Sequence, residues 1–397
     1  MTQLLSQLSI GIARWSLLPP ITDPNFFGVS CTKRLEPSAI FLSALFMNLL
    51  TKKISKIRAS LPWLAVTGIS AAAAVAATKL VRGSRPTLDL RGKVALITGG
   101  SRGLGFALAQ ELGEQGCRLA LCARNAAELE EACGRLRKKS IEATPFTCDI
   151  SDKSDAETLI NRVLDELGAI DILINNAGHI TVGPLEAFDH SDFERAMNVM
   201  FWGPLNLTFA VLPHMKSRRR GHIVNITSVG GRVSIPHLLP YSCAKFALVG
   251  FSTGLSTELR SQGIHVLTAV PGLMRTGSYL NAEFKGDARN EFAWFALLGN
   301  LPGFSVATRY AARCIRTALI QQKRVCTISI PAKILIAKEA LTPEIMRATL
   351  QFVNRAILPS YNGSSRTFTG KHLSPSFSGL FKGLTHLGKL AAREFNE

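Results

Sequence analysis

Paired cysteines are absent from this 397-residue sequence. Its eight cysteines include no C-x-x-C pair, and none stands at a zinc-type spacing from another cysteine or a histidine. Disulfide-stapled domains and zinc modules both depend on such spacings. The sequence therefore argues against a disulfide framework and predicts no metal site, and most of the cysteines are expected as small core residues of a reducing compartment.

Acidic residues are scarce, with 28 Asp and Glu against 46 Lys and Arg. The imbalance lies in the flanks: residues 1–90 hold 10 basic against 3 acidic residues, 91–300 hold 22 against 21, and 301–397 hold 14 against 4. A nucleic-acid enzyme is expected to place its basic surface beside its active region. Because the central part is nearly neutral, nucleic acid is not an expected partner, and the basic flanks favour an anionic membrane surface.

The N-terminal region, residues 1–87, differs from the rest of the chain. Its segment Leu61–Thr78 contains no charged residue and approaches the length of about 20 residues that spans a bilayer. Lysines and arginines flank it on both sides, so the positive-inside rule does not decide its orientation. Three interpretations stay open: a signal anchor, a cleaved export signal, and a soluble or interfacial helix. Met47 is an alternative start of the chain.

From residue 88 onward, short apolar runs alternate with longer helical patterns. The alternation predicts an α/β fold of the Rossmann type, a doubly wound parallel sheet in three layers, over residues 88–300. Each run is continuously apolar, as expected of a strand buried on both faces. The expected strands are Val94–Thr98, Leu119–Cys122, Thr144–Cys148, Ile170–Asn175, His222–Thr227 and His265–Ala269.

Residues 301–397 are expected to form a basic C-terminal extension. A helix is expected at 310–320, a further strand at 325–330 and a Ser/Gly/Thr-rich linker at 362–375. Over 380–395, helical spacing places leucines on one face and basic residues on the other. Such an amphipathic helix fits either a membrane surface or docking on the protein's own core.

A glycine-rich segment joins the first expected strand to a helix. It reads Thr98-Gly99-Gly100-Ser101-Arg102-Gly103-Leu104-Gly105. Glycines allow a tight turn and let backbone N–H groups approach a pyrophosphate, whose charge is then held at the helix N-terminus. Because the segment follows a strand and precedes a helix, it predicts a dinucleotide site and not a simple turn.

The spacing TGxxxGxG resembles that of the short-chain dehydrogenase/reductase family, and Arg102 stands where the family's extended branch has glycine. Further matches are Asp149, which in the family touches the adenine, and Asn175-Asn176-Ala177-Gly178 after the fourth strand. The resemblance covers roughly residues 88–280. It implies these cofactor-binding residues: Thr98, Gly99, Ser101, Arg102, Gly103, Leu104, Gly105, Arg124, Asp149, Asn176, Ala177, Gly178, Tyr241, Lys245, Pro271, Gly272 and Thr276.

The end of the second strand indicates which nicotinamide cofactor is used. NAD-binding proteins commonly have an acidic residue there to hold the ribose 2′-hydroxyl, but this chain has Ala123, Arg124 and Asn125. Arg124, together with Arg102 of the glycine-rich segment, offers two cations to a 2′-phosphate. The sequence therefore favours NADP(H) over NAD(H).

Tyr241 and Lys245 stand one helical turn apart, on the same face of an expected helix. An ammonium about 4 Å from a phenol favours phenolate by roughly 4 kcal/mol at an effective dielectric near 20, on the order of three pKa units before solvent screening. In the family, Ser228 would hold the substrate oxygen while Tyr241 exchanges the proton. Asn198 matches the fourth member of the family's catalytic set.

These residues imply an oxidoreductase that interconverts a carbonyl and an alcohol. The apolar run 277–299 and Ile235, Leu238 and Leu239 suggest a pocket for a lipophilic substrate; packing between helices or between subunits of a homo-oligomer is the alternative for them. We expect the enzyme at a membrane with its catalytic domain facing the cytoplasm, or free in the cytoplasm without an anchor. Two other hypotheses are a catalytically silent NADP(H) sensor or scaffold and a membrane-shaping protein.

Overall fold

The computed structural model describes residues 87–397 apart from Ser378, and this part of the chain is one compact unit. The apolar run 61–78 and Met47 lie outside the described residues. No described helix is both long enough and apolar enough to cross a lipid bilayer.

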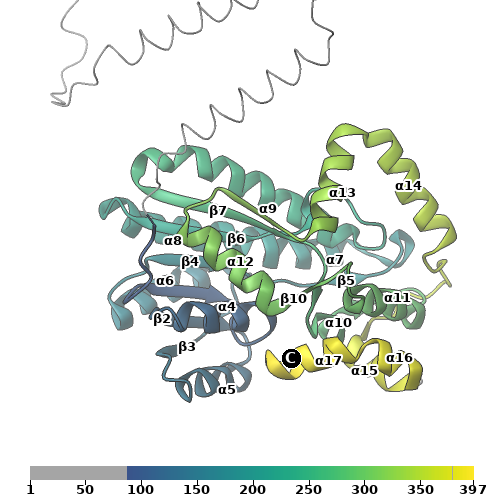
Figure 1. The fold of residues 1–397 in the computed structure, drawn as a ribbon, viewed down its shortest axis with the longest axis horizontal. Helices are drawn as coiled ribbons and strands as arrows, with labels where there is room; N and C mark the ends of the chain where they lie inside the picture. The colour runs from purple at the N-terminus through teal and green to yellow at the C-terminus, as the bar shows by residue number, and fades with distance from the viewer. Residues whose placement is uncertain (1–86, 378) are drawn as a thin grey trace, which may run out of the picture. The chain divides into compact units, whose positions relative to one another are not determined.

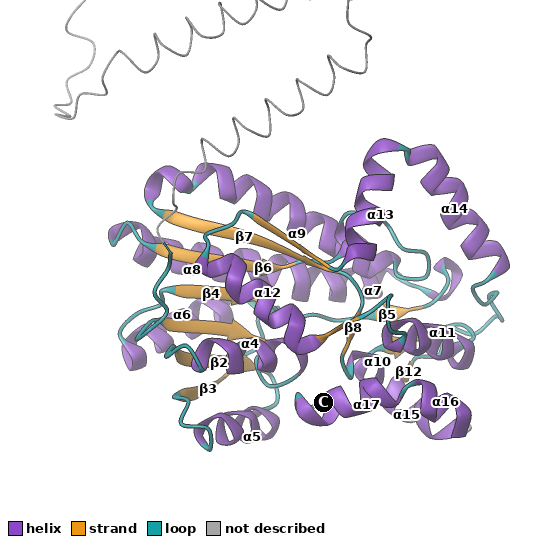
Figure 2. Ribbon diagram, in the orientation of Figure 1, coloured by secondary structure: helices purple, strands orange, loops and turns teal. Residues whose placement is uncertain are grey.

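Seven parallel strands form the central sheet (Figure 2). They are β1 Val94–Thr98, β2 Arg118–Ala123, β3 Ala143–Thr147, β4 Ile172–Asn175, β6 Gly221–Ile226, β7 Ile264–Pro271 and β11 Val325–Ile328. Their order across the sheet is β11-β7-β6-β4-β1-β2-β3. The six expected strands and the further strand near 325 are confirmed, with ends that shift by up to two residues.

Helices cover both faces of the sheet, which confirms the three-layer prediction (Figure 1). One face carries α4 Gly103–Gly113, α5 Ala126–Arg137 and α12 Thr308–Ile320. The other face carries α6 Lys153–Leu167, α8 Gly203–Ser217 and α9 Leu239–Glu258. Because each central strand is buried on both sides, all five residues of β1 are buried.

Local sequence signals explain where these helices begin and end. In α6, the Asp152 carboxylate accepts hydrogen bonds from Ser154 N and Asp155 N, and Gly168 ends the helix in the left-handed conformation. Buried apolar residues recur along this helix at intervals of three and four, so one stripe faces the sheet: Ala156, Leu159, Ile160, Val163 and Leu167.

The strand order reverses between β1 and β4. All seven strands are parallel, but β2 and β3 are added on one side of β1, whereas β4, β6, β7 and β11 are added on its other side. In open α/β sheets, ligands bind beyond the carboxyl ends of the strands at such a reversal. The glycine-rich segment leaves β1 at this point, and Asn176–Gly178 leave β4 beside it.

Smaller elements lie between these strands and helices and in the last hundred residues. They are β5 Thr181–Val182, η2 Leu185–Ala187, α7 His190–Met197, η3 Asn198–Trp202, η4 Val229–Gly231, η5 Arg260–Gln262, β8 Met274–Arg275, α10 Ser278–Asn281, β9 Glu283–Phe284, α11 Ala288–Asn300 and β10 Val306–Ala307. After β11 follow α13 Ile330–Leu341, α14 Pro343–Ala356, β12 Phe368–Thr369, α15 Gly370–Leu373, η6 Ser374–Ser376, α16 Gly379–Leu384 and α17 His386–Glu394.

The structure departs from two expectations in this last part. The expected linker 362–375 contains β12, which pairs antiparallel with β9, and α15. The single helix expected over 380–395 is divided into α16 and α17, with the buried Thr385 between them. In α17, the small residues Gly388 and Ala392 are buried while Leu387 and Leu390 are exposed, so the docked face is not the leucine face.

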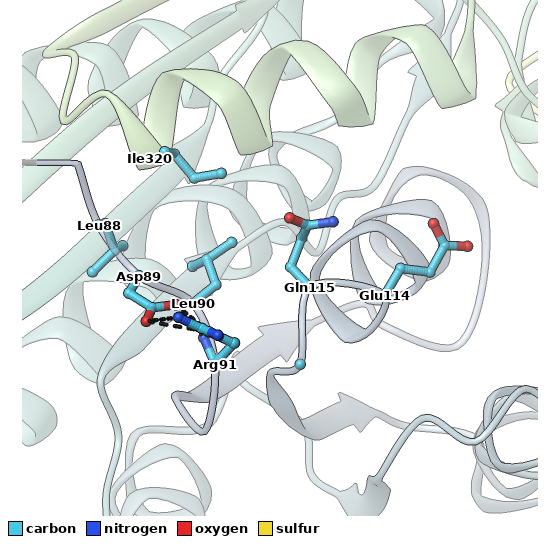
Figure 3. A pocket seen from close by; sticks show the side chains of 8 residues that line it. Leu88, Asp89, Leu90, Arg91, Glu114, Gln115 and Ile320 are labelled. Atoms are coloured by element: carbon cyan, nitrogen blue, oxygen red, sulfur yellow. Dashed lines mark hydrogen bonds and ion pairs between the residues drawn. The ribbon is translucent and has the colours of Figure 1, made fainter.

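A cavity of about 430 Å³ lies at the end of α4, whereas the glycine-rich segment lies at the beginning of that helix. Figure 3 shows the residues that line the cavity. Leu88, Leu90 and Ile320 line it together with Glu114 and neighbouring residues at the end of α4. Since α4 begins at the glycine-rich segment, an 11-residue helix of roughly 16 Å separates the two regions. This cavity is therefore not the expected dinucleotide site.

Candidate functional site

The glycine-rich segment turns tightly between β1 and α4. Gly99 and Gly103 have positive φ angles of 62° and 57°. A Cβ atom on Gly105 would lie 2.0 Å from the Gly99 carbonyl oxygen, so only glycine allows the segment and the helix to approach so closely. Arg102 precedes the first turn of α4 without a side-chain cap, and that turn contains no acidic residue. The first turn is therefore suited to an anion.

Thr98 and Asn176 hold the segment against the end of β4. Thr98 Oγ1 accepts hydrogen bonds from Asn176 N at 3.0 Å and Ala177 N at 3.2 Å. Asn176 Nδ2 donates to the carbonyl oxygens of Thr98 at 3.0 Å and Gly99 at 3.2 Å. Thr98 and Asn176 thus fix the position of the glycine-rich segment through hydrogen bonds to backbone atoms.

A carboxylate that the sequence reasoning missed lies beside the loop. Glu128 accepts a hydrogen bond from Ser101 Oγ at 2.6 Å and pairs with Arg102 at 3.2 Å. Glu128 stands in the first turn of α5, whose N-cap Asn125 follows Arg124 directly. One feature of the sequence could have identified Glu128: it follows the end of β2 after only a few residues.

Arg124 lies at the end of β2 with 70% of its side chain exposed. Its guanidinium is 4.0 Å from the Asp149 carboxylate, which in turn accepts a hydrogen bond from Ser151 Oγ at 2.7 Å. Arg102 and Arg124 therefore reach the same end of the site from two elements, and each has a carboxylate partner.

Ser228, Tyr241 and Lys245 lie close together beyond the carboxyl end of β6. Ser228 follows β6, and its Oγ accepts a hydrogen bond from Gly230 N at 3.0 Å. Tyr241 and Lys245 lie in the first two turns of α9. A Cβ atom on Gly230 would lie 3.1 Å from the Tyr241 ring and 3.5 Å from Ser228 Oγ, so the phenol and the serine hydroxyl flank the same glycine. Lys245 Nζ donates to the Ile226 carbonyl oxygen at 2.8 Å and stands 5.7 Å from the centre of the Tyr241 ring.

Burial dominates the protonation of this group. It raises the pKa of Tyr241 above its ordinary value, and the hydrogen bond from Ser228 opposes that rise only in part. It lowers the pKa of Lys245 to about 8. The sequence argument expected the Lys245 ammonium to lower the phenol pKa, but desolvation of the phenol outweighs that effect in this structure.

Asn198 makes no hydrogen bond with Ser228, Tyr241 or Lys245. It is exposed and begins η3, a π-helical segment of five residues in the chain between α7 and α8. Met200, two residues later, is fully buried and packs in one apolar cluster with Ala244 and Tyr241. The wider π-helical turn thus carries a thioether toward Tyr241 and leaves the Asn198 amide in solvent.

The segment after β7 closes the other side of the site. Pro271 is the last residue of β7, and Gly272 N donates to Ile328 O at 3.2 Å, which joins the segment to β11. Thr276 is buried, and its Oγ1 donates to Ser278 Oγ at 2.7 Å. Thr276 therefore lies on the segment that leads from the sheet into α10.

Most of the large residues in the apolar run 277–299 form a small core of their own. Tyr279, Phe284 and Phe292 are buried together, and Phe377 and Phe381 stack against Phe292. The packing alternative therefore holds for these three residues. Smaller side chains remain partly buried against the cluster that also includes Tyr241: Ile180, Ile235 and Leu280.

Residues 395–397, which the sequence reasoning assigned no role, cover the glycine-rich segment. Gly103 N donates to Phe395 O at 2.8 Å, and Asn396 Nδ2 donates to Ser101 O at 3.0 Å. The Glu397 carboxylate accepts a hydrogen bond from Gly277 N. No feature of the sequence placed these residues at the loop, because they are almost 300 positions away from it.

Comparison with known proteins agrees with this geometry. The sequence model of a family described as short chain dehydrogenase matches residues 93–284. Over 210 residues the chain is 35% identical to dehydrogenase/reductase SDR family member 7B of Danio rerio, covering 51% of this chain and 68% of that protein. The chain belongs to the short-chain dehydrogenase/reductase family.

Two further similarities support the family. The fatty acyl-CoA reductase of Acinetobacter baylyi is 35% identical over 190 residues, which are 47% of this chain and 64% of that protein. The chain thus matches somewhat less than two thirds of that relative's length. A crystal structure of a short-chain dehydrogenase from Streptomyces avermitilis superposes with a TM-score of 0.57 at 28% identity, over 66% of this chain and 96% of that one. Members of this oxidoreductase family bind nicotinamide dinucleotides.

Proposed function

We propose that this protein is an NADP(H)-dependent oxidoreductase that interconverts a carbonyl and an alcohol on a lipophilic substrate. The observation that carries the proposal is the meeting of Ser228, Tyr241 and Lys245 beyond the carboxyl ends of the strands, on the same edge of the sheet as the glycine-rich segment. A protein that merely bound a dinucleotide would not need a phenol next to a serine hydroxyl and a buried lysine amine.

The residues present fit a dinucleotide. The tight approach at Gly105 and the uncapped first turn of α4 suit a pyrophosphate, and Arg102 and Arg124 suit a 2′-phosphate. Lys245 and Thr276 would face the nicotinamide end. When bound, the dinucleotide supplies or accepts the hydride.

The remaining chemistry belongs to the chain's own side chains. Ser228 Oγ would donate a hydrogen bond to the substrate oxygen and hold it beside the Tyr241 hydroxyl. A phenol whose pKa is raised keeps its proton at neutral pH, so Tyr241 is suited to donate that proton to a developing alkoxide. The Lys245 ammonium would stabilise the phenolate left behind. This protonation state favours reduction of a carbonyl.

The substrate class is inferred from the surroundings of Tyr241 and from one relative. Ile180, Ile235 and Leu280 give the region around the phenol apolar walls. The Acinetobacter protein is named for fatty acyl-CoA, which has a long apolar chain. We therefore infer a carbonyl compound with a substantial apolar part.

Replacement of the phenol tests the proposal. Tyr241→Phe should lower NADPH-dependent turnover of lipophilic aldehydes and ketones by about 100-fold to 10,000-fold, the usual contribution of a general acid. Its dissociation constant for NADPH should stay within about twofold of the parent's. Tyr310→Phe is the matched control, since Tyr310 is 55% exposed on α12 and does not belong to the apolar cluster that includes Tyr241. Equal turnover in the two variants would exclude Tyr241 as the acid.

A second observation favours an anionic membrane surface as a partner. On α13, Ile330, Ile334 and Leu341 are exposed at helical spacing, and on α14 Ile345 and Phe352 are exposed in the same way, each with 54–80% of its surface accessible. Six exposed cations accompany them: Lys323, Arg324, Lys333, Lys338, Arg347 and Arg355.

The charge of this helical pair favours lipid over a second copy of the chain. Residues 323–357 contain two acidic residues, Glu339 and Glu344, against the six cations. A two-fold contact between identical copies would bring like charges together, whereas anionic headgroups would neutralise them. Apolar residues with flanking lysines and arginines are typical of helices that lie in the plane of a membrane interface.

A further inference from the structure

The segment that follows α17 crosses the loop where the dinucleotide of the proposed function would bind. The backbone N–H of Gly103, at the start of α4, donates to Phe395 O at 2.8 Å. A Cβ atom on Gly103 would lie 2.7 Å from Glu397 Oε1, so the carboxylate rests against the glycine itself. The segment therefore uses an N–H group that the proposed function assigns to the pyrophosphate.

The same three residues span the width of the site. Asn396 Nδ2 donates to Ser101 O at 3.0 Å on the adenine side of the loop. Glu397 accepts from Gly277 N, next to Thr276 on the nicotinamide side. The segment thus contacts both the glycine-rich segment and the segment that follows β7.

The segment is held in place by packing and by hydrogen bonds. Phe395 is buried in the main core. Arg135 of α5 donates to Asn396 Oδ1 at 2.9 Å and to Glu394 O at 2.7 Å. On α17, a Cβ atom on Gly388 would lie 2.1 Å from Asn300 Oδ1, so the helix fits closely against α11. Packing and hydrogen bonds together thus hold residues 394–396 and α17 in this position.

The chemistry of the segment matches that of the ligand it would displace. The segment offers hydrogen-bond acceptors, as a pyrophosphate would: the Phe395 carbonyl oxygen accepts from Gly103 N at the start of α4, and the Glu397 carboxyl accepts from Gly277 N. Burial raises the pKa of the Glu397 carboxyl to about 7, while Arg102 and Lys371 act in the opposite direction. Enclosure of Glu397 is therefore costly only when its carboxyl is ionised, so a rise in pH favours release of the segment.

We propose that residues 395–397 are an internal competitor of the dinucleotide: they occupy the glycine-rich segment in the free protein and must leave it before NADP(H) binds. This regulation rests on the proposed function. It makes the apparent affinity for the cofactor equal to the intrinsic affinity multiplied by the fraction of molecules whose loop is uncovered.

Direct binding of NADPH to the full chain tests the proposal. We compare the parent protein with Glu397→Ala and with a deletion of residues 395–397, by fluorescence titration of NADPH. If the segment covers the loop in about nine molecules of ten, both variants should bind NADPH about tenfold more tightly. Glu394→Ala is the matched control, because its exposed side chain pairs with Arg309 at 2.7 Å and does not touch the loop.

Hydrogen exchange provides a second readout that does not depend on turnover. In the parent protein, saturating NADPH should increase exchange of the backbone amides in 391–397, because the segment is displaced. Unchanged exchange in 391–397, together with equal dissociation constants for the parent and both variants, would overturn the competitor proposal. Absence of NADPH binding in the parent and in both variants would instead overturn the cofactor assignment.

Discussion

At the scale of single residues, the site shows charges that already have partners within the chain. Arg102 pairs with Glu128, and Arg124 stands 4.0 Å from Asp149. A 2′-phosphate would have to compete with these carboxylates for the two guanidinium groups. Cofactor choice therefore depends on a balance among four side chains and not on the arginines alone.

Substitution of these residues should shift the preference between NADPH and NADH. Arg124→Asp should weaken NADPH binding by about tenfold, the lower part of the range for a hydrogen bond to a charged group, because Arg124 is largely exposed. Glu128→Gln should strengthen NADPH binding, since it frees Arg102 from its carboxylate partner. The ratio of the dissociation constants for NADPH and NADH is the measurement.

Arg118→Asp is the control for these substitutions. It makes the same charge change at the other end of β2, where Arg118 pairs with Glu142. A ratio that moves equally in Arg118→Asp and Arg124→Asp would show a general charge effect in place of a 2′-phosphate contact.

The pKa of Lys245 predicts an alkaline limit to carbonyl reduction. Burial lowers this pKa from 10.5 to about 8, so the ammonium is fully present below about pH 7 and is lost as the pH rises through 8. The pKa of Tyr241 is raised, so the phenol does not titrate in this range. A profile of kcat/KM against pH should therefore fall with a midpoint near 8. A flat profile from pH 7 to 9 would contradict the role of the ammonium.

The titration of Lys245 also makes the free energy of unfolding depend on pH, and this quantity should rise over a range in which activity falls. The unfolded chain keeps its lysine protonated up to about 10.5, whereas the folded chain releases the proton near 8. The unfolded state thus binds more protons between these values, and the free energy of unfolding should rise with pH in this window. Urea titrations of the parent and Lys245→Met at pH 8 and 10 would show the rise in the parent and its loss in the variant.

At the scale of elements, α13 and α14 form the part of the described chain with the most exposed large apolar side chains at helical spacing. With vesicles of phosphatidylserine and phosphatidylcholine, backbone amides of 330–357 in the full chain should exchange several-fold more slowly. The double variant Ile334→Glu and Phe352→Glu should abolish this protection, because it places charge on both helices where the lipid would lie.

Hydrogen exchange localises the effect even if another segment also binds lipid. Phe209→Glu is the control, since Phe209 is 58% exposed on α8, outside the helical pair. Protection of 330–357 that appears without vesicles and grows with protein concentration would indicate a second copy of the chain instead.

The central elements were predictable because their signals are local. The five residues of β1 are apolar or small and lie between turn residues, and the first-turn signals of α6 stand next to one another in the sequence. The residues Ser228, Tyr241 and Lys245 were predictable for the same reason, since a fixed interval and one helical turn relate them. The family and the fold class follow from these local patterns.

Other parts of the site could not be predicted because they depend on contacts between distant segments. Met200 packs in the cluster with Tyr241 from a π-helical turn, whose extra residue no composition signal marks. The packing of Phe292 against Phe377 joins two segments that are separated by 85 positions. The division between α16 and α17 follows from the docking of Gly388 and Ala392 on the body of the protein.

At the scale of the whole molecule, the last helix packs back against earlier parts of the described chain. Helix α17 lies near α10, and residues 395–397 lie near the beginning of α4 (Figure 1). Four groups on different elements face the Glu397 carboxylate: Arg102, Glu128, Tyr279 and Lys371. Arg102 and Lys371 lower its pKa, and Glu128 and burial raise it. Docking of this segment therefore depends on pH.

The sign of this dependence follows from the raised pKa. The carboxyl has a pKa of about 7 when docked, against an ordinary value of 4.5, so docking is strongest below 4.5 and weakens as the pH rises to 7. NADPH should therefore bind the parent more tightly, by about tenfold, as the pH increases from 5 to 7.5. The ratio of its dissociation constant to that of Glu397→Gln removes the titration of NADPH itself. A ratio that stays constant from pH 5 to 7.5 would contradict this account.

The position of residues 395–397 also affects how the protein should be handled. A purification tag or fluorescent reporter fused after residue 397 would begin next to Gly103. It would either displace residues 395–397 or obstruct the glycine-rich segment sterically. Dissociation constants for NADPH measured on such a fusion would therefore differ from those of the untagged protein. The exposed turn at 360–363 is a better place to insert a label.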